Sequence, residues 1–218
     1  MLKLILGNRT YSSWSLRGWL ACKQAGLPFE EQLIPLREGD WQARKRQPDI
    51  AVSRGTLPVL WDGDTAAWNA LGIIDYLDQL TDGTRFWPQD RAARAFIQSV
   101  AVEMQSGYMP LRQALPMNVR RHYRDVQLPD DVLADVARID SLWSEALERF
   151  GGPWLAGAEF GAADIMFAPV ASRFSTYGVT LSDAARRYRV AVMAHPWMVE
   201  WITAAAEEPW VLAHNERD

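Results

Sequence analysis

Short apolar runs alternate with helical stripes along the first part of the chain. Four runs have the length and alternation of strands: residues 4–6, 29–36, 57–61 and 65–68. Helical patterns lie between and after them, at residues 16–23, 41–47 and 69–83. The turn Asp62-Gly63-Asp64 is typical of a hairpin. The order β-α-β-α-β-β-α predicts a mixed α/β sheet with helices packed on it.

From residue 89 onward the pattern is helical only. Apolar stripes cover residues 92–104, 132–147, 165–174 and 197–205, and the third is apolar enough to be central. The change of pattern falls within residues 81–89, where Asp82-Gly83 and Pro88 are typical of a linker. The sequence therefore predicts an α/β domain over residues 1–81 and an all-helical domain over residues 89–218.

Composition and charge narrow the classes of function. The 218 residues carry 23 basic and 27 acidic side chains, and a net charge of −4 argues against a nucleic-acid partner. The single cysteine, Cys22, fits a reducing compartment, and the opening residues show no signal-like cleavage region. No apolar stretch approaches the ~20 residues that span a bilayer. We expect a cytoplasmic protein without a membrane partner, and the scattered histidines predict no metal site.

Leu57-Pro58 opens a strand-like run with a residue that lacks an N–H. The common interpretation is an edge-strand turn, because proline is tolerated only at edges, first positions and bulges. The alternative is a cis Leu57-Pro58 bond, which would leave the backbone groups of Leu57 free to pair with an extended peptide.

Two predicted helix starts follow strands. Asn69-Ala70-Leu71-Gly72 begins one helix, whose free N–H groups attract a carboxylate, although an ordinary Asn cap explains the same residues. The other start holds Ser12, Ser13 and Ser15, of which one is enough to cap the helix. A hydroxyl there is also placed to stabilise a thiolate. Together the three sites suggest a small peptide thiol held along one sheet edge.

The motifs that carry these sites resemble those of the glutathione transferase superfamily over nearly the whole chain. "YSSWSLRGWL" resembles the motif of serine-type bacterial transferases and is similar to the Ser-Ser-Cys-Ser-Trp-Arg motif of the zeta class, the maleylacetoacetate isomerases. "GTLPVLWDGD" with "AWNALGIIDYL" resembles the cis-proline loop and its helix, and "FGAADIMFAPV" the helix start in the C-terminal domain. The resemblance implies a thioredoxin-like N-terminal domain, an all-helical C-terminal domain and a homodimer.

The resemblance also implies roles for residues. Ser12 or Ser13, depending on which class is aligned, would donate a hydrogen bond to the glutathione thiolate. Leu57, before Pro58, would pair with the cysteinyl backbone, and Asn69 and Ala70 would lie at the γ-glutamyl carboxylate. The electrophile would bind between the domains, near Trp14 and a helix that carries three further residues: Met104, Tyr108 and Leu111.

Two positions depart from the family pattern. Asn69-Ala70 replaces an acidic residue followed by serine, so one hydroxyl donor to glutathione is missing. Its loss costs ~1.5–3 kcal/mol if the partner is charged. Gly161 replaces a Ser or Thr cap, which glycine tolerates, and Asp164 can still complete part of a capping box.

The resemblance implies an enzyme with glutathione as its co-substrate and no metal. The expected reaction is conjugation of a small apolar electrophile, as in detoxification, or a glutathione-dependent isomerisation. The alternative is a non-catalytic binding or scaffold protein of the same fold, such as the stringent-starvation proteins, and the missing hydroxyl at Ala70 favours it.

Overall fold

The four strands form one mixed sheet in a computed structural model that describes residues 1–217. The sheet order is β2-β1-β3-β4, and the members are β1 (Leu2–Leu6), β2 (Phe29–Leu33), β3 (Val59–Asp62) and β4 (Thr65–Trp68). β1 pairs in parallel with β2 and antiparallel with β3, and β3 pairs antiparallel with β4. The hairpin predicted at Asp62-Gly63-Asp64 is confirmed.

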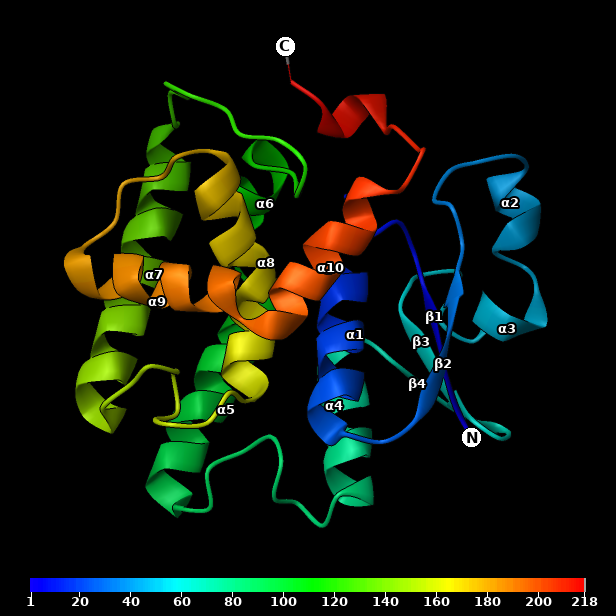
Figure 1. Cartoon of the computed structure of the whole chain (residues 1–218), viewed down its shortest axis with the longest axis horizontal. Helices are drawn as coiled ribbons and strands as arrows, with labels where there is room; N and C mark the ends of the chain where they lie inside the picture. Colours follow the sequence, from blue (N-terminus) through cyan, green and yellow to red (C-terminus); the bar gives the residue numbers. More distant parts are fainter. Residues whose placement is uncertain (218) are drawn as a thin grey trace.

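The sheet separates two layers of helices because successive side chains of a strand point to opposite faces. Leu2, Leu4 and Leu6 join the main core with α1 (Ser13–Ala25) and α4 (Ala70–Leu80). Ile5 points the other way and packs with Ile50 of α3 (Pro48–Ala51). Figure 1 shows α2 (Trp41–Arg44) and α3 on that second side of the sheet.

Several element boundaries differ from the sequence prediction. The strand predicted to reach residue 36 ends at Leu33, and the helix predicted over 41–47 is the shorter α2. The single-turn helix α3 had no detectable periodicity in the sequence. β3 begins at Val59 rather than at residue 57, since Pro58 cannot donate to the ladder.

Only helices follow α4 among the described residues. They are α5 (Arg91–Ser106), α6 (Met109–Ala114), α7 (Asp130–Phe150), α8 (Ala162–Thr176), α9 (Asp183–Ala194) and α10 (Pro196–Ala206), with a 3-10 turn at Ala213–Asn215. The sequence pattern predicted neither α6 nor α9. The thioredoxin-like first half and the helical second half agree with the predicted fold class.

α8 is the central helix, as its composition predicted. Its N-terminus is held by Asp164, which accepts hydrogen bonds from the N–H of Gly161 at 2.9 Å, the N–H of Leu155 at 3.0 Å and the hydroxyl of Tyr188 at 2.9 Å. Gly161 has no side chain, so only the Asp164 half of a capping box forms. Burial raises the pKa of the Asp164 carboxyl to about 6 against these hydrogen bonds.

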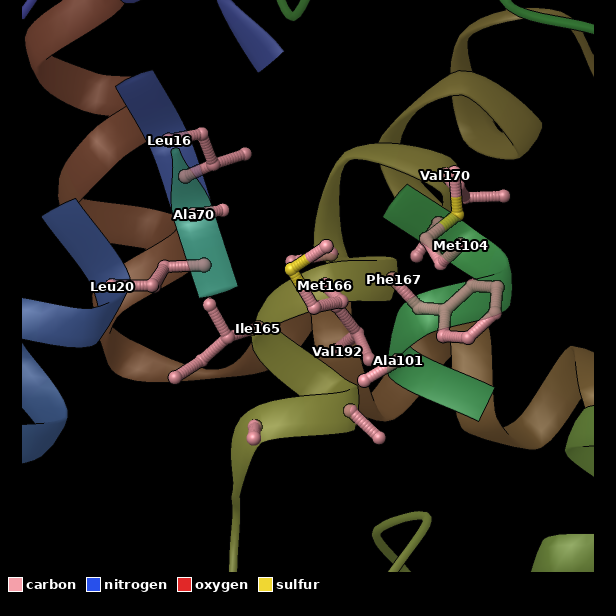
Figure 2. Close-up of a cluster of buried hydrophobic side chains, with 14 of the residues drawn as sticks. Leu16, Leu20, Ala70, Ala101, Met104, Ile165, Met166, Phe167, Val170 and Val192 are labelled. Carbon is pink, nitrogen blue, oxygen red and sulfur yellow. The ribbon is translucent and has the colours of Figure 1, made fainter. Parts of the chain in front are cut away.

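The two halves of the chain share one hydrophobic core. Figure 2 shows Ile165 and Met166 of α8 facing Leu16 and Leu20 of α1, with Ala70 of α4 beside them. A polar contact crosses the same boundary, because the Nε of buried Arg17 donates to the carbonyl of Met166 at 2.8 Å. The start of α1 is therefore fixed from both the sheet and the helical half.

Candidate functional site

A cavity of about 410 Å³ opens at the start of α1. Ser12, Ser13 and Trp14 form one wall, and Leu57 lies on another. A cavity of about 300–1,000 Å³ is typical of a small-molecule site. The structure thus brings together three of the predicted groups, which are far apart in sequence: the early serines, Trp14 and the residue before Pro58.

The hydroxyl groups of Ser12 and Ser13 have different partners. The Oγ of Ser12 caps α1 by accepting from the N–H of Ser15 at 3.2 Å, and it donates to the Oγ of Ser15 at 2.8 Å. The Oγ of Ser13 accepts from Nη2 of Arg173 at 3.4 Å. Its own proton has no acceptor within residues 1–217. Ser13 therefore has a donor to offer to a ligand, whereas the proton of Ser12 is already in use.

The Leu57-Pro58 peptide bond is cis, which confirms the less common of the two interpretations of this dipeptide. Neither backbone group of Leu57 makes a backbone hydrogen bond within the described residues. Pro58 packs tightly on α1 at Gly18, where an added Cβ would lie 2.6 Å from its Cγ. The absence of a side chain at Gly18 is what allows the Leu57-Pro58 turn to lie against α1.

The start of α4 does not line this cavity. Asn69 is exposed, has a φ of 65° and forms no side-chain cap, so the ordinary Asn cap is not found. Ala70 is fully buried against the core (Figure 2). The N–H of Leu71 is not free, since it donates to Oε1 of Gln105 on α5 at 3.3 Å. Of the expected γ-glutamyl contacts, only Asn69 is accessible to a ligand.

The three residues expected at the electrophile site beside Trp14 do not line the cavity either. Met104 and Leu111 are fully buried in the core. Tyr108 is 7% exposed, and its hydroxyl donates to Glu103 at 2.6 Å. Their spacing on the helical pattern reflects packing, and only Trp14 of that set faces the cavity.

Further cavity residues are ones that sequence reasoning did not select. Arg37, Lys45 and His214 line it, together with Leu212 and other residues, and no Asp or Glu is among the lining residues. Arg37 lies close to His214, with Nη1 3.5 Å from Nδ1. Burial, and then the charge of Arg37, lower the pKa of His214, which favours the neutral imidazole. The cavity carries a positive charge that favours an anionic ligand.

The segment after α10 forms the wall that contains Leu212 and His214. Its first anchor is Glu208, whose carboxylate accepts from the N–H of Arg9 at 2.7 Å and of Thr10 at 3.0 Å. A second anchor is Glu216, which accepts from the hydroxyl of Tyr11 at 2.6 Å. No periodicity marks this segment in the sequence, so only the three-dimensional structure reveals its place beside the start of α1.

The described residues, 1–217, contain no group of three or more His, Cys, Asp or Glu side chains that could hold a metal ion. Over the same range, every helix is too short or too polar to cross a membrane.

A cis-proline loop facing a hydroxyl-bearing helix start, on a thioredoxin-like sheet followed by a helical half, is the arrangement expected of a thiol-binding protein. Two family models match the chain: "Glutathione S-transferase, N-terminal domain" at residues 11–80 and "Glutathione S-transferase, C-terminal domain" at residues 106–204. The chain belongs to the glutathione S-transferase superfamily.

Individual relatives agree with this. A maleylacetoacetate isomerase of Rattus norvegicus is 25% identical over 177 residues, which are 80% of this chain and 78% of the relative. Glutathione S-transferase L3 of Arabidopsis thaliana is 27% identical over 177 residues, 78% of this chain and 67% of the relative. A glutathione transferase homolog from Burkholderia gl BGR1, solved with bound glutathione, is similar in structure, with a TM-score of 0.71 at 19% identity. The match covers 95% of this chain and 99% of the homolog's chain.

Proposed function

We propose that the cavity at the start of α1 binds glutathione and holds its sulfur as a thiolate for reaction with an electrophile. By family, the chain is a glutathione-dependent transferase or isomerase with glutathione as its co-substrate. The observation that carries the residue assignment is the free hydroxyl proton of Ser13, in a cavity that also contains the unpaired backbone edge of Leu57.

The shape and charge of the cavity support an acidic tripeptide. Leu57 offers one N–H and one C=O, which can pair with the cysteinyl unit as a neighbouring strand would. Arg37 and Lys45 can pair with the carboxylate at one end of the peptide, and no lining carboxylate opposes it. The γ-glutamyl end has a weaker anchor, because Ala70 lacks a hydroxyl and the N–H of Leu71 is taken by Gln105.

Ser13 is the group that we assign to the thiol. An unperturbed serine is not a base at neutral pH, so the thiol loses its proton to water and the hydroxyl stabilises the thiolate that remains. Ser12 caps α1 and orients the first turn. This assignment separates two serines that motif resemblance does not distinguish, because either can match the family motif.

The test measures glutathione binding by calorimetry and glutathione-dependent loss of a model aryl halide, with maleylacetoacetate-type isomerisation as a second assay. Ser13→Ala is expected to lower turnover ~10²-fold, as removal of one donor to a developing anion does. Ser12→Ala, the matched control, is expected to retain turnover within a few-fold. A larger loss of turnover in Ser12→Ala than in Ser13→Ala would mean that Ser12, not Ser13, contacts the thiol.

The scaffold alternative has one observation in its favour, the missing hydroxyl at Ala70. Wild type and Ala70→Ser are compared in the same two assays. Absence of binding and turnover in both would leave the chain as a non-catalytic member of the family. Turnover in the wild type excludes that role.

We also propose that the enzyme acts as a cytoplasmic homodimer on a small, mainly apolar electrophile, with a role in detoxification. Family membership supports the homodimer, and Trp68, Leu80 and Val102, which are 39%, 43% and 53% exposed, are candidate contact residues. Light scattering is expected to give twice the chain mass of 24.7 kDa. The chain mass itself would contradict the dimer.

A further inference from the structure

Three arginines converge behind the start of α1. Arg17 comes from α1, Arg112 from α6 and Arg173 from α8. Arg17 and Arg173 are only 1% and 6% exposed. None of the three forms an ion pair with a carboxylate of residues 1–217. Buried cations without a counter-ion are costly, so this cluster calls for a reason.

Neutral carbonyl groups hold the cluster in place. The Nε of Arg17 donates to the carbonyl of Met166 at 2.8 Å, and the Nε of Arg173 donates to that of Leu115 at 2.7 Å. Arg112 donates to the carbonyls of Met104 and Gln105 at the end of α5. These bonds satisfy donors but supply no counter-charge. The buried Nη2 of Arg17 has no partner among the described residues.

The charges face the cavity through two residues that line it. The Nη2 of Arg173 donates to the Oγ of Ser13 at 3.4 Å, and Nη1 of Arg17 donates to the Ser13 carbonyl at 3.4 Å. The guanidinium carbons of Arg17 and Arg112 lie 4.5 Å and 5.1 Å from the centre of the Trp14 ring. The cavity wall that Ser13 and Trp14 form is thus backed by cations.

The arginines repel one another, and a guanidinium group keeps its proton at neutral pH. Burial, and then the charge of Arg112, lower the pKa of Arg173 to about 10. Burial and the other two guanidinium groups lower that of Arg17. Asp135 of α7 accepts from the N–H of Leu111 at 3.0 Å, and its charge opposes the lowering of the pKa of Arg112. Tyr177, just after α8, opposes the lowering of the pKa of Arg173 in the same way. An anion entering the cavity would relieve the repulsion.

We propose that Arg173, supported by Arg17 and Arg112, is a positioning residue that polarises the Ser13 hydroxyl and stabilises the glutathione sulfur as a thiolate. Arg173 acts through Ser13. The guanidinium donates to the hydroxyl oxygen, so the hydroxyl becomes a stronger donor to sulfur. The thiol proton leaves to water, and no other bond changes. This inference rests on the proposed function and adds the source of the electrostatic stabilisation.

The test is a pH titration of the thiolate absorbance of bound glutathione. Arg173→Met is expected to raise the pKa of the bound thiol by about one unit, which lowers the thiolate fraction about tenfold below that pKa. Arg173→Lys is expected to recover part of the shift. The matched control Arg186→Met removes an exposed arginine of α9 that pairs with Asp183, and is expected to change nothing.

Binding of S-methylglutathione, which has no ionisable thiol, separates this role from a structural one. Its affinity is expected to stay within about twofold in Arg173→Met, because the tripeptide contacts remain. An unchanged thiol pKa in Arg173→Met, or the same rise in Arg186→Met, would overturn the inference. Loss of S-methylglutathione affinity with an unchanged thiol pKa would instead mean that the arginine cluster binds a carboxylate of the tripeptide.

Two further results keep the inference separate from other failures. If wild type binds neither glutathione nor S-methylglutathione, the proposed function fails first. If Arg173→Met does not fold, the half-buried Arg112→Met provides the measurement, and a thiol pKa equal to that of the wild type would then overturn the inference.

Discussion

At the scale of single residues, neighbouring serines have separate tasks. The side chain of Ser12 forms its hydrogen bonds with Ser15 in the first turn of α1, whereas the hydroxyl proton of Ser13 is free to bind a ligand. The sequence places both hydroxyls at the helix start and cannot separate them, because their difference depends on Arg173, 160 positions away. An arginine within an otherwise apolar helical stripe was a signal that could have indicated a long-range polar contact.

Loss of the Ser12 cap tests this division of tasks through stability. Ser12→Ala is expected to lower the free energy of unfolding by ~1 kcal/mol, since the N–H of Ser15 loses its acceptor. Urea denaturation measures the change, and Ser13→Ala should lower stability by less. Equal losses in the two variants would mean that Ser12 does not act as the cap.

Asp164 is expected to give the unfolding free energy a distinct pH dependence. Burial raises its pKa in the folded state to about 6, from 3.8 in the unfolded chain. Folding therefore favours the protonated form, and this contribution to stability is present below pH 4 and disappears as the pH rises through 6. Relative to Asp164→Asn, the wild type should lose about 3 kcal/mol over that window. A difference that does not vary with pH would mean that the carboxyl is not desolvated.

At the scale of elements, the strongest periodic patterns were predicted well. The strand at Leu4, the hairpin at Gly63 and the central helix around Ile165 follow from local alternation and apolar content alone. The helices α3, α6 and α9 were missed because α3 is a single turn, α6 follows a break at Gly107, and arginines interrupt the apolar pattern of α9. Met104 and Leu111 were expected at the site because a core stripe and a pocket stripe have the same spacing.

Gly18 links α1 to the loop that carries Leu57. Gly18→Ala places a Cβ 2.6 Å from Cγ of Pro58, so α1 or the loop must shift. We expect a loss of ~1–3 kcal/mol in unfolding free energy, as for overpacked cores, together with weaker glutathione binding. Calorimetry and urea titration measure the two effects. Gly72→Ala is the control, because an added Cβ there meets nothing within 4 Å.

At the scale of the whole molecule, the cavity is completed by parts of the chain that the sequence does not connect. The loop before β3 supplies Leu57, α1 supplies Ser13, and the segment after α10 supplies Leu212 and His214. Figure 1 shows this last segment, in red, passing from α10 above the start of α1. Motif resemblance identifies the first two contributions, whereas a segment without motif or periodicity can only be placed by its contacts.

Removal of the segment after Trp210 is expected to open one wall of the cavity. The anchor at Glu208 remains, so the fold should persist, whereas Leu212 and His214 are lost. We expect glutathione affinity to fall about tenfold, equivalent to ~1.4 kcal/mol. Calorimetry measures the affinity and circular dichroism checks the fold. Unchanged affinity in a folded variant would show that the segment does not contact the ligand.

The most direct test of the central claim is the structure of the complex with glutathione. The claim predicts the sulfur within about 3.5 Å of the Oγ of Ser13, with the cysteinyl backbone paired to Leu57. A sulfur bound to Ser12, or distant from both serines, would contradict it.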